Sequence, residues 1–211
     1  MLLNPQKILR VFIFIRLFIN YVHQKKTLMK HQIIYLTGFM GAGKSTIGPI
    51  LANTLGWNYY DVDQVIENKF GRKISDIFKQ EGESYFRRVE RETFVELSNS
   101  DKIIISLGGG AVANQENLDF FKKNGKIIYL KVSPEVAYER LKFKNDRPLL
   151  SDAASGNLSK NEFIDKIQNI LNSRERFYEQ ADYIVLTDDS SIGKTVDKIA
   201  KKILAGELFN S

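Results

Sequence analysis

Eight residues near the start of the chain have the types and spacing of a phosphate-binding loop. They read Gly38-Phe39-Met40-Gly41-Ala42-Gly43-Lys44-Ser45, the pattern G-x-x-x-x-G-K-S, and they follow an apolar run at residues 33–36. In this pattern the glycines let backbone N–H groups turn toward phosphates, the lysine reaches the β- and γ-phosphates, and the serine hydroxyl ligates Mg²⁺. A helix that opens near Lys44 adds the positive end of its dipole. The segment therefore predicts binding of a nucleoside triphosphate.

Two aspartates, Asp61 and Asp63, are the candidates for the acids of such a site. The most apolar strand candidate, residues 103–107, ends in glycines and not in an acid, so a metal-binding carboxylate must come from elsewhere. On extended backbone, residues two apart face the same side. One carboxylate is then expected near hydrated Mg²⁺, and the other can accept a proton from an attacking hydroxyl. A solvated strand end is the alternative interpretation of this short motif.

Three further features are suited to a small anionic substrate. Arg87 and Glu90 are three residues apart and therefore neighbours on a helix, where the glutamate can orient the arginine to bind a carboxylate. Gly108-Gly109-Gly110 would let a substrate approach backbone N–H groups closely. Arg174 lies late in a following helix. A surface ion pair, a flexible turn and a surface arginine are the respective alternatives.

A polar stretch rich in small residues, 145–159, lies between two helical patterns. We interpret it as part of a mobile lid over the site, and a plain surface loop is the alternative. Arg147 begins its Arg-Pro-Leu-Leu segment, so closure of the lid would bring this positive charge onto a phosphoryl group in transfer.

Strand patterns alternate with helical patterns along the chain, which predicts an α/β fold with a parallel sheet covered on both faces. Strands are expected at residues 32–37, 58–61, 102–107, 126–131 and 183–186. Helices are expected at residues 44–54, 62–69, 75–98, 115–123, 134–142, 160–180 and 192–205.

Length and composition narrow the class of protein. The 211 residues, 43% of them hydrophobic, suit one domain at 29–211. The absence of cysteine excludes disulfides, thiolate metal sites and cysteine nucleophiles, and two lone histidines do not make a zinc site. The net charge of +6 comes almost entirely from residues 1–28, which hold five basic residues and no acid. We therefore expect no nucleic-acid partner.

Residues 1–28 form an apolar and basic N-terminal extension. Arg16 interrupts its apolar run, which is too short and too charged to predict a membrane span, and no small-residue cleavage site follows. We expect Met29 to be the true start and the extension to lie outside the fold, while a membrane-surface segment is the alternative. The expected protein is cytoplasmic and monomeric.

Taken together, these motifs resemble the shikimate kinase family. The order G-x-x-G-x-G-K-S-T, D-x-D, G-x-x-x-F-R-x-x-E, L-G-G-G, R-P-L-L and R-x-x-x-Y runs from about Lys30 to Leu204. The resemblance implies transfer of the γ-phosphoryl group of ATP to the 3-hydroxyl of shikimate, a step of aromatic amino acid biosynthesis, with Mg²⁺ as cofactor. It also implies a three-layer α/β/α P-loop kinase fold with a five-stranded parallel sheet and a lid at about 143–159.

The resemblance also assigns roles to individual residues. The ATP phosphates would be held by Gly41, Ala42, Gly43, Lys44, Ser45 and Thr46, with Arg140 beside the adenine and the turn at 188–191 bordering it. Ser45 and Asp61 would bind the metal ion. Shikimate would be held by Asp63, Arg87, Gly108, Gly109, Gly110 and Arg174. Catalysis would depend on Asp63 as base, on Lys44 and on Arg147.

Two features depart from the family pattern, and two alternatives stay open. Pro49 replaces a common arginine inside the helix after the phosphate loop, where proline removes one backbone donor. The N-terminal extension is the second departure. A related small-molecule kinase, such as a gluconate kinase, is one alternative, although Arg87, the glycine triplet and Arg174 favour an anionic cyclic polyol. A catalytically silent relative is the other, although no residue with an assigned catalytic role is missing.

Overall fold

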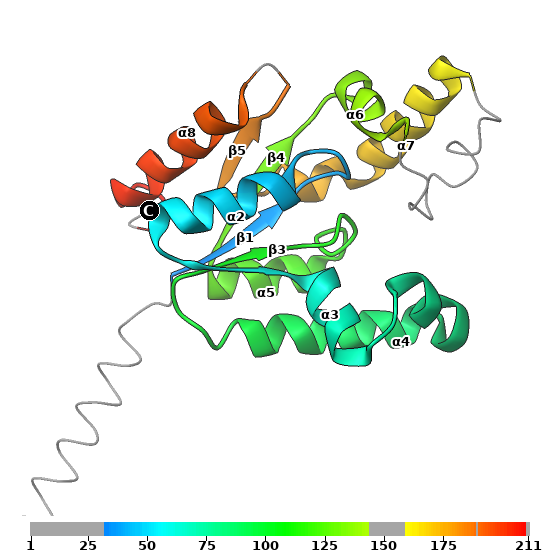
Figure 1. Ribbon diagram of the computed structural model, residues 1–211, viewed down its shortest axis with the longest axis horizontal. Coiled ribbons are helices and arrows are strands. Elements are labelled where there is room, and N and C mark those ends of the chain that lie inside the picture. Colours follow the sequence, from blue (N-terminus) through cyan, green and yellow to red (C-terminus); the bar gives the residue numbers. More distant parts are fainter. Residues whose placement is uncertain (1–31, 144–158, 189, 210–211) are drawn as a thin grey trace, which may run out of the picture. The chain divides into compact units, whose positions relative to one another are not determined.

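Five parallel strands form the centre of the structure, a computed structural model that describes residues 32–143, 159–188 and 190–209. The strands are β1 (Ile33–Thr37), β2 (Asn58–Asp61), β3 (Ile103–Ser106), β4 (Lys126–Lys131) and β5 (Tyr183–Leu186), in the spatial order β2-β3-β1-β4-β5. Every residue of β1 and β3 is buried, as expected for central parallel strands that are covered on both faces. The predicted five-stranded parallel sheet is confirmed (Figure 1).

The helices of the described residues connect and cover these strands. They are α2 (Lys44–Leu55), α3 (Val62–Phe70), α4 (Ile74–Leu97), α5 (Gln115–Asn124), α6 (Pro134–Leu141), α7 (Lys160–Tyr178) and α8 (Ile192–Leu204). Their ends carry the expected signals: Ser133 caps α6 ahead of Pro134, and Ser159 forms a capping box with Glu162 at the start of α7. The predicted helices and strands agree with these bounds within two residues.

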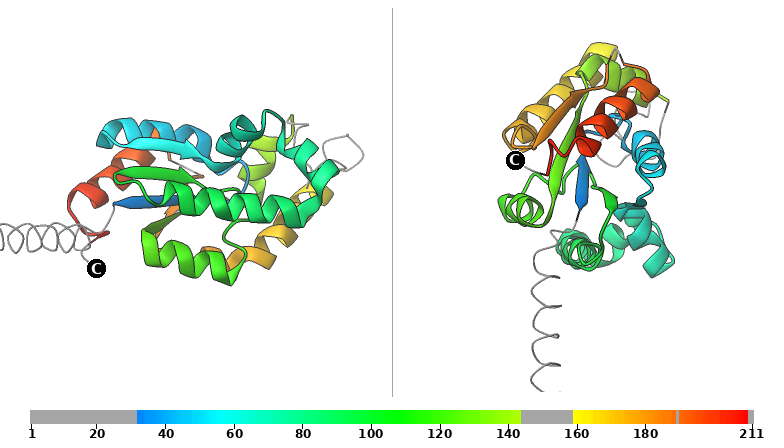
Figure 2. Two further views of the ribbon diagram at one scale, coloured as in Figure 1. Left: turned by 90° about the horizontal axis from the view of Figure 1, so that it is seen from below. Right: turned by 90° about the vertical axis from the view of Figure 1, so that its left-hand side faces the viewer.

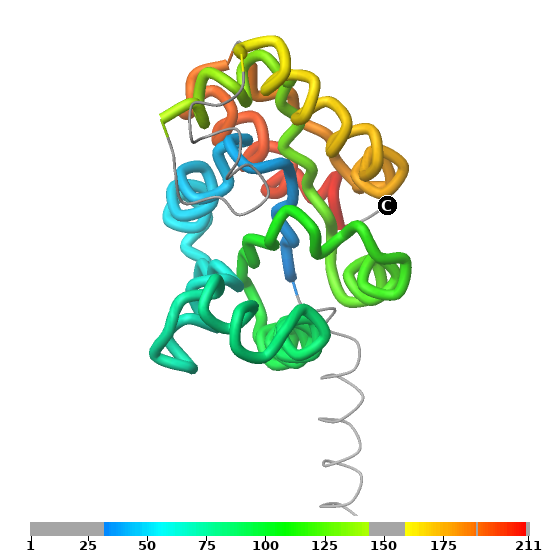
Figure 3. The backbone as a smooth tube through the Cα atoms, turned by 90° about the vertical axis from the view of Figure 1, so that its right-hand side faces the viewer, coloured from blue at the N-terminus to red at the C-terminus, as the bar shows by residue number. Residues whose placement is uncertain are grey.

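The helices lie in two layers, which confirms the α/β/α arrangement (Figures 2 and 3). On one face, Tyr35 of β1 packs against Phe121 of α5 at 4.6 Å between ring centroids, and Tyr129 of β4 stacks on Tyr178 of α7 at 4.7 Å. On the other face, α2 packs against α8 and the sheet. In the described residues, no helix combines the length and apolar character needed to cross a bilayer.

The sheet topology puts the ends of β1, β2 and β3 at one edge. β1 lies between β3 and β4: the chain runs from β1 to β2 and β3 on one side of it, and then crosses to β4 and β5 on the other side. In open α/β sheets, ligands bind beyond the carboxyl ends of the strands at such a switch point. The phosphate loop follows β1, Asp61 ends β2, and the glycine triplet follows β3. The register pairs Leu36 with Ser106, and Ser106 with Asp61, so the carboxyl ends of β1, β3 and β2 are level across the sheet.

Two local expectations differ from the structure. Asp63 does not lie on extended backbone beside Asp61, because α3 begins at Val62 and Asp61 is its N-cap residue. The carboxylate of Asp61 accepts from the backbone N–H groups of Asp63 and Gln64, which favours a helix directly after the strand. The predicted helix at 75–98 is present as α4 but is broken at Gly82, whose φ of 82° and ψ of 171° are non-helical.

Two predicted segments lie outside the described residues. One is the extension at 1–28, and with it the domain start at Met29. The other is nearly all of the lid, including Arg147. The compact unit to which the sheet belongs begins at Gln32.

Candidate active site

The phosphate loop is shaped by glycines in left-handed conformation. Gly41 has a φ of 81° and Gly43 a φ of 99°, values that L side chains rarely adopt. Gly43 is the N-cap of α2, so the first N–H groups of that helix lie beside the loop. The Lys44 ammonium donates to the carbonyls of Gly38 at 2.7 Å and Phe39 at 3.3 Å, which fixes its charge at the loop. Dipole, N–H groups and lysine together make an anion site.

The Asp61 carboxylate is held at the end of β2 by several donors. Its Oδ1 accepts from the Asp63 N–H at 3.1 Å and the Gln64 N–H at 3.4 Å, and its Oδ2 accepts from the Tyr59 hydroxyl at 3.4 Å. Burial raises the pKa of Tyr59 to about 12, so this phenol stays a donor at neutral pH. These contacts fix the position of the Asp61 carboxylate beside the phosphate loop.

Arg87 on α4 lies between two carboxylates. Its Nη1 donates to the buried Glu90 at 3.0 Å, while Nε and Nη2 donate to the exposed Glu83 at 3.2 and 3.1 Å. The Arg87 side chain is 43% exposed and that of Glu90 only 3%, so the buried member of this ion pair is the glutamate. Burial raises the pKa of Glu90, although Arg87 partly offsets it. Partial burial lowers the pKa of Arg87, but the nearby charges of Glu90 and Glu83 raise it by more, so the net direction is upward.

The glycine turn after β3 brings a second arginine to the same place. The carbonyl of Gly109 accepts from Arg174 Nη1 at 2.9 Å and from the Tyr178 hydroxyl at 2.6 Å, both from α7. A Cβ on Gly110 would lie 3.5 Å from Nη2 of Arg87 and 4.0 Å from Nη2 of Arg174. The two guanidinium groups therefore converge over backbone that has no side chain.

Acidic groups lie against the first glycine of this turn. A Cβ on Gly108 would be 3.4 Å from Oδ1 of Asp63 and 3.5 Å from Oε1 of Glu90. Asp63 thus reaches the glycine turn from α3, although its backbone is helical and not extended. A small acidic polyol at this turn would meet arginines toward Gly110 and the Asp63 carboxylate toward Gly108.

Arg140 on α6 connects the phosphate loop with the turn after β5. It donates to the carbonyl of Gly41 at 2.9 Å and to that of Thr187 at 2.8 Å. The predicted adenine side at 188–191 contributes Ser190 to the same pocket. These contacts place Arg140 between the phosphate loop and the turn after β5.

One pocket of about 980 Å³ contains all of these features. Its lining includes every predicted site residue that the structure describes: Gly41, Ala42, Gly43, Lys44, Ser45, Thr46, Asp61, Asp63, Arg87, Gly108, Gly109, Gly110, Arg140 and Arg174. The structure therefore brings together residues from the ends of three strands and from five helices.

Several lining residues were missed by the sequence reasoning. The rings of Phe78 and Phe86 pack at a tilt, 4.6 Å apart between centroids, and form an apolar wall on α4. The two residues are eight apart in the sequence, on either side of Gly82. Because the break at Gly82 changes the helical phase, their spacing does not reveal that they pack together. The contact of Glu83 with Arg87 could have been predicted, because residues four apart on a helix are neighbours.

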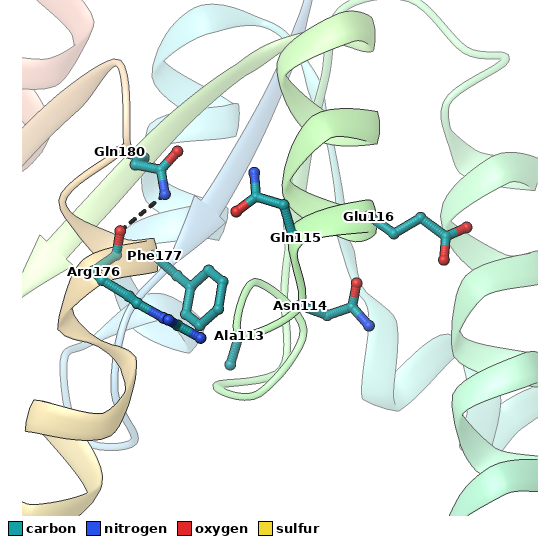
Figure 4. Close-up of a pocket in the computed structure, with 7 residues that line it drawn as sticks. All are labelled: Ala113, Asn114, Gln115, Glu116, Arg176, Phe177 and Gln180. Atoms are coloured by element: carbon teal, nitrogen blue, oxygen red, sulfur yellow. Dashed lines mark hydrogen bonds between the residues drawn. The ribbon is translucent and has the colours of Figure 1, made fainter.

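A second pocket of about 650 Å³ lies on the other side of the glycine turn, between the start of α5 and the end of α7 (Figure 4). It is lined by Ala113, Asn114, Gln115, Glu116, Arg176, Phe177 and Gln180. No predicted site residue is among them.

The donor set beside the phosphate loop fits Mg²⁺. Among the residues the structure describes, no cluster of three or more histidine, cysteine or acidic side chains could hold a metal by itself. Mg²⁺ usually takes only one or two protein oxygens, with water and substrate phosphates as its other ligands. The Ser45 hydroxyl and the Asp61 carboxylate, which line the same pocket, supply such oxygens.

A parallel sheet in this order, a phosphate loop after β1 and an acceptor pocket beside it define a P-loop kinase that acts on a small molecule. The shikimate kinase family model matches residues 40–204, and the chain belongs to that family. The family match decides against the gluconate kinase alternative.

Relatives of known name agree with this placement. The chain is 46% identical over 173 residues to a shikimate kinase of Chlorobium phaeobacteroides, which covers 82% of this chain and 91% of that protein. The corresponding identity to a shikimate kinase of Chlorobaculum parvum is 42%, with 82% and 92% covered.

Solved structures with similar folds are also shikimate kinases. That of Bacteroides thetaiotaomicron matches with a TM-score of 0.74 and 34% identity, covering 82% of this chain and 98% of that one. That of Acinetobacter baumannii, solved in complex with shikimate, matches with a TM-score of 0.74 and 34% identity over 87% of this chain and 98% of that one.

Proposed function

We propose that this chain transfers the γ-phosphoryl group of ATP to the 3-hydroxyl of shikimate. The observation that supports this most is the convergence of Arg87 and Arg174 over Gly110 in the pocket that also contains the phosphate loop. A carboxylated cyclic triol needs cations at one end and a hydroxyl acceptor at the other. The arginine pair and Asp63 have this arrangement.

On the nucleotide side, residues 41–46 would surround the phosphates. The N–H groups at the start of α2 would face the β-phosphate. The Lys44 ammonium would stay beside the negative charge of the γ-phosphoryl group during its transfer. Arg140 would lie beside the adenine. Ser45 and Asp61 would hold Mg²⁺, which supplies charge neutralisation at the β- and γ-phosphates when it is bound.

On the acceptor side, Arg87 and Arg174 would bind the carboxylate of shikimate, and the turn at Gly108, Gly109 and Gly110 would bring backbone close to the ring. Asp63 would accept the proton of the 3-hydroxyl as the hydroxyl oxygen bonds to the γ-phosphorus. The bond from that phosphorus to the bridging oxygen of ADP breaks in the same displacement, and ADP leaves. Positioning and charge neutralisation supply most of the catalysis in such transfers.

Arg147 lies outside the described residues, and its part in the proposal is to approach the transferred phosphoryl group from the lid. The cytoplasmic location and the monomeric state are proposed with the activity.

The test is to identify the product. The purified chain is incubated with ATP, Mg²⁺ and shikimate, and the product is analysed by phosphorus and proton NMR. One phosphate monoester coupled to the proton at C3 is expected, and gluconate offered in place of shikimate should yield none. A phosphate on another hydroxyl, or a preference for gluconate, would contradict the proposal.

A further inference from the structure

The glycine turn at 108–110 consists of backbone, so its position depends on neighbours that bond to its carbonyls. On the pocket side, Arg174 and Tyr178 hold the carbonyl of Gly109. On the far side, the next residue, Ala111, is held by a different element. Its carbonyl accepts from the side-chain amide of Asn117, in the first turn of α5, at 3.0 Å.

Asn117 is itself fixed by an arginine on α4. Arg91 Nη1 donates to Oδ1 of Asn117 at 2.8 Å. An arginine can only donate and a carbonyl can only accept, so a single orientation of the amide satisfies both partners. The Arg91 guanidinium also lies over the ring of Phe120 at 4.5 Å, which holds it against α5.

Arg91, which fixes Asn117, lies on the same helix as Arg87, the arginine proposed to bind the substrate. Arg91 is four residues after Arg87, one turn along α4 and on the same side. The chain of contacts from Arg91 through Asn117 to Ala111 therefore ties this helix to the turn over which Arg87 and Arg174 converge. A displacement of the turn relative to α4 would change the gap that receives a carboxylate.

We propose that Asn117 is a positioning residue for substrate binding: with Arg91 it fixes the glycine turn at the distance from Arg87 that the carboxylate of shikimate requires. This inference rests on the proposed function. Asn117 touches no substrate and acts through the backbone of the turn. Its effect belongs to the shikimate site and not to the phosphate loop, which connects β1 to α2.

The sharpest variant is Asn117→Asp. It keeps the shape of the side chain and the acceptor for Arg91, but it sets a carboxylate oxygen against the Ala111 carbonyl in place of a donor. We expect the KM for shikimate to rise about tenfold, the scale of one lost hydrogen bond. The KM for ATP and the melting temperature should change little, because α2 and the core are not touched.

Glu116→Gln is the matched control. Glu116 neighbours Asn117, points toward α4 (Figure 4) and lies 3.6 Å from Arg91, but its side chain is 81% exposed. Exposed pairs of this kind contribute little. Kinetics close to those of the unchanged protein are expected for this variant.

Hydrogen exchange of residues 108–113 gives a readout that needs no substrate. Asn117→Asp should exchange faster there and should leave residues 38–46 unchanged. A shikimate KM within twofold of the unchanged protein would overturn the proposal. Equal rises in both KM values with a lower melting temperature would also overturn it, since they indicate general packing. If the unchanged protein does not turn over shikimate, the proposed function fails, and the exchange still decides whether Asn117 holds the turn.

Discussion

Arg87 is in contact with the buried Glu90 and the exposed Glu83, and the proposed complex adds the carboxylate of shikimate as a third anion. Glu90 cannot move far because it is buried behind the glycine turn. Glu83 is 66% exposed and can swing into water. The substrate carboxylate is therefore expected to take the place of Glu83 on the guanidinium while Glu90 keeps it oriented.

Arg87→Ala should weaken shikimate binding and leave ATP binding unchanged. Loss of charge-assisted hydrogen bonds predicts a rise in the KM for shikimate of about 10- to 100-fold. Steady-state kinetics with each substrate varied in turn measure the effect. Arg88→Ala is the control, because Arg88 lies over the ring of Tyr85 and does not line the pocket. Equal kinetics for the two variants would remove Arg87 from the site.

Asp63→Asn should lower kcat and leave the fold intact. The amide cannot accept the proton of the 3-hydroxyl, and loss of a general base typically costs about 10²- to 10⁴-fold. Single-turnover ADP formation measures the chemical step, and the melting temperature reports on folding. A kcat near that of the unchanged protein would reject Asp63 as the base.

Glu90 predicts a pH dependence of stability. Burial raises its pKa above the ordinary value of 4.5, so the folded state favours the protonated carboxyl. Its contribution to the free energy of unfolding is then full below pH 4.5 and is lost as the pH rises through the raised pKa. Relative to Glu90→Gln, the unchanged protein should lose stability over this window. Denaturant unfolding at several pH values measures the difference, and a constant difference across pH would contradict the assignment.

At the scale of elements, α2 and β2 approach each other very closely beside the site. A Cβ on Gly48 would lie 2.3 Å from the ring of Tyr59, whose hydroxyl donates to Asp61. The glycine therefore sets the distance between the helix that follows the phosphate loop and the strand that ends at Asp61. Pro49, the residue after it, is exposed, and α2 continues through it to Leu55.

Gly48→Ala should destabilise the protein by about 1–3 kcal/mol, because the added methyl group overpacks the Tyr59 ring. Gly193→Ala is the matched control on a helix, since a Cβ there meets nothing within 4 Å. That control should be neutral or stabilising by up to about 1 kcal/mol. Chemical unfolding of both variants tests the pair, and equal stability of the two would show that the contact at Gly48 does not constrain the packing.

The elements were largely predictable, whereas their contacts were not. Ser133, Pro134 and the buried isoleucines of β1 and β3 act locally, so the sequence signals them. The break at Gly82 depends on a backbone conformation that the letters of a helical pattern do not reveal. The bonds from Asn117 to Ala111 and from Arg91 to Asn117 join elements that pair only after folding. Arg87, Arg174 and the glycine triplet could be chosen from their types, but their convergence required the structure.

At the scale of the whole molecule, the described residues that line the pocket begin at Met40. The family match also begins at residue 40, and the compact unit that holds the sheet begins at Gln32. We therefore predict that removal of residues 1–28 leaves kcat/KM for both substrates unchanged. Parallel kinetics of the full and shortened chains measure this, and a large loss in the shortened chain would make the extension part of the enzyme.

The most direct test of the account is ADP release by the full chain with ATP and Mg²⁺, measured with and without shikimate. The account predicts slow release without shikimate and strong, saturable stimulation by it. ATP binding without any stimulation by shikimate would contradict the account, because the phosphate loop would then be intact while the pocket at Arg87 and Arg174 served another acceptor.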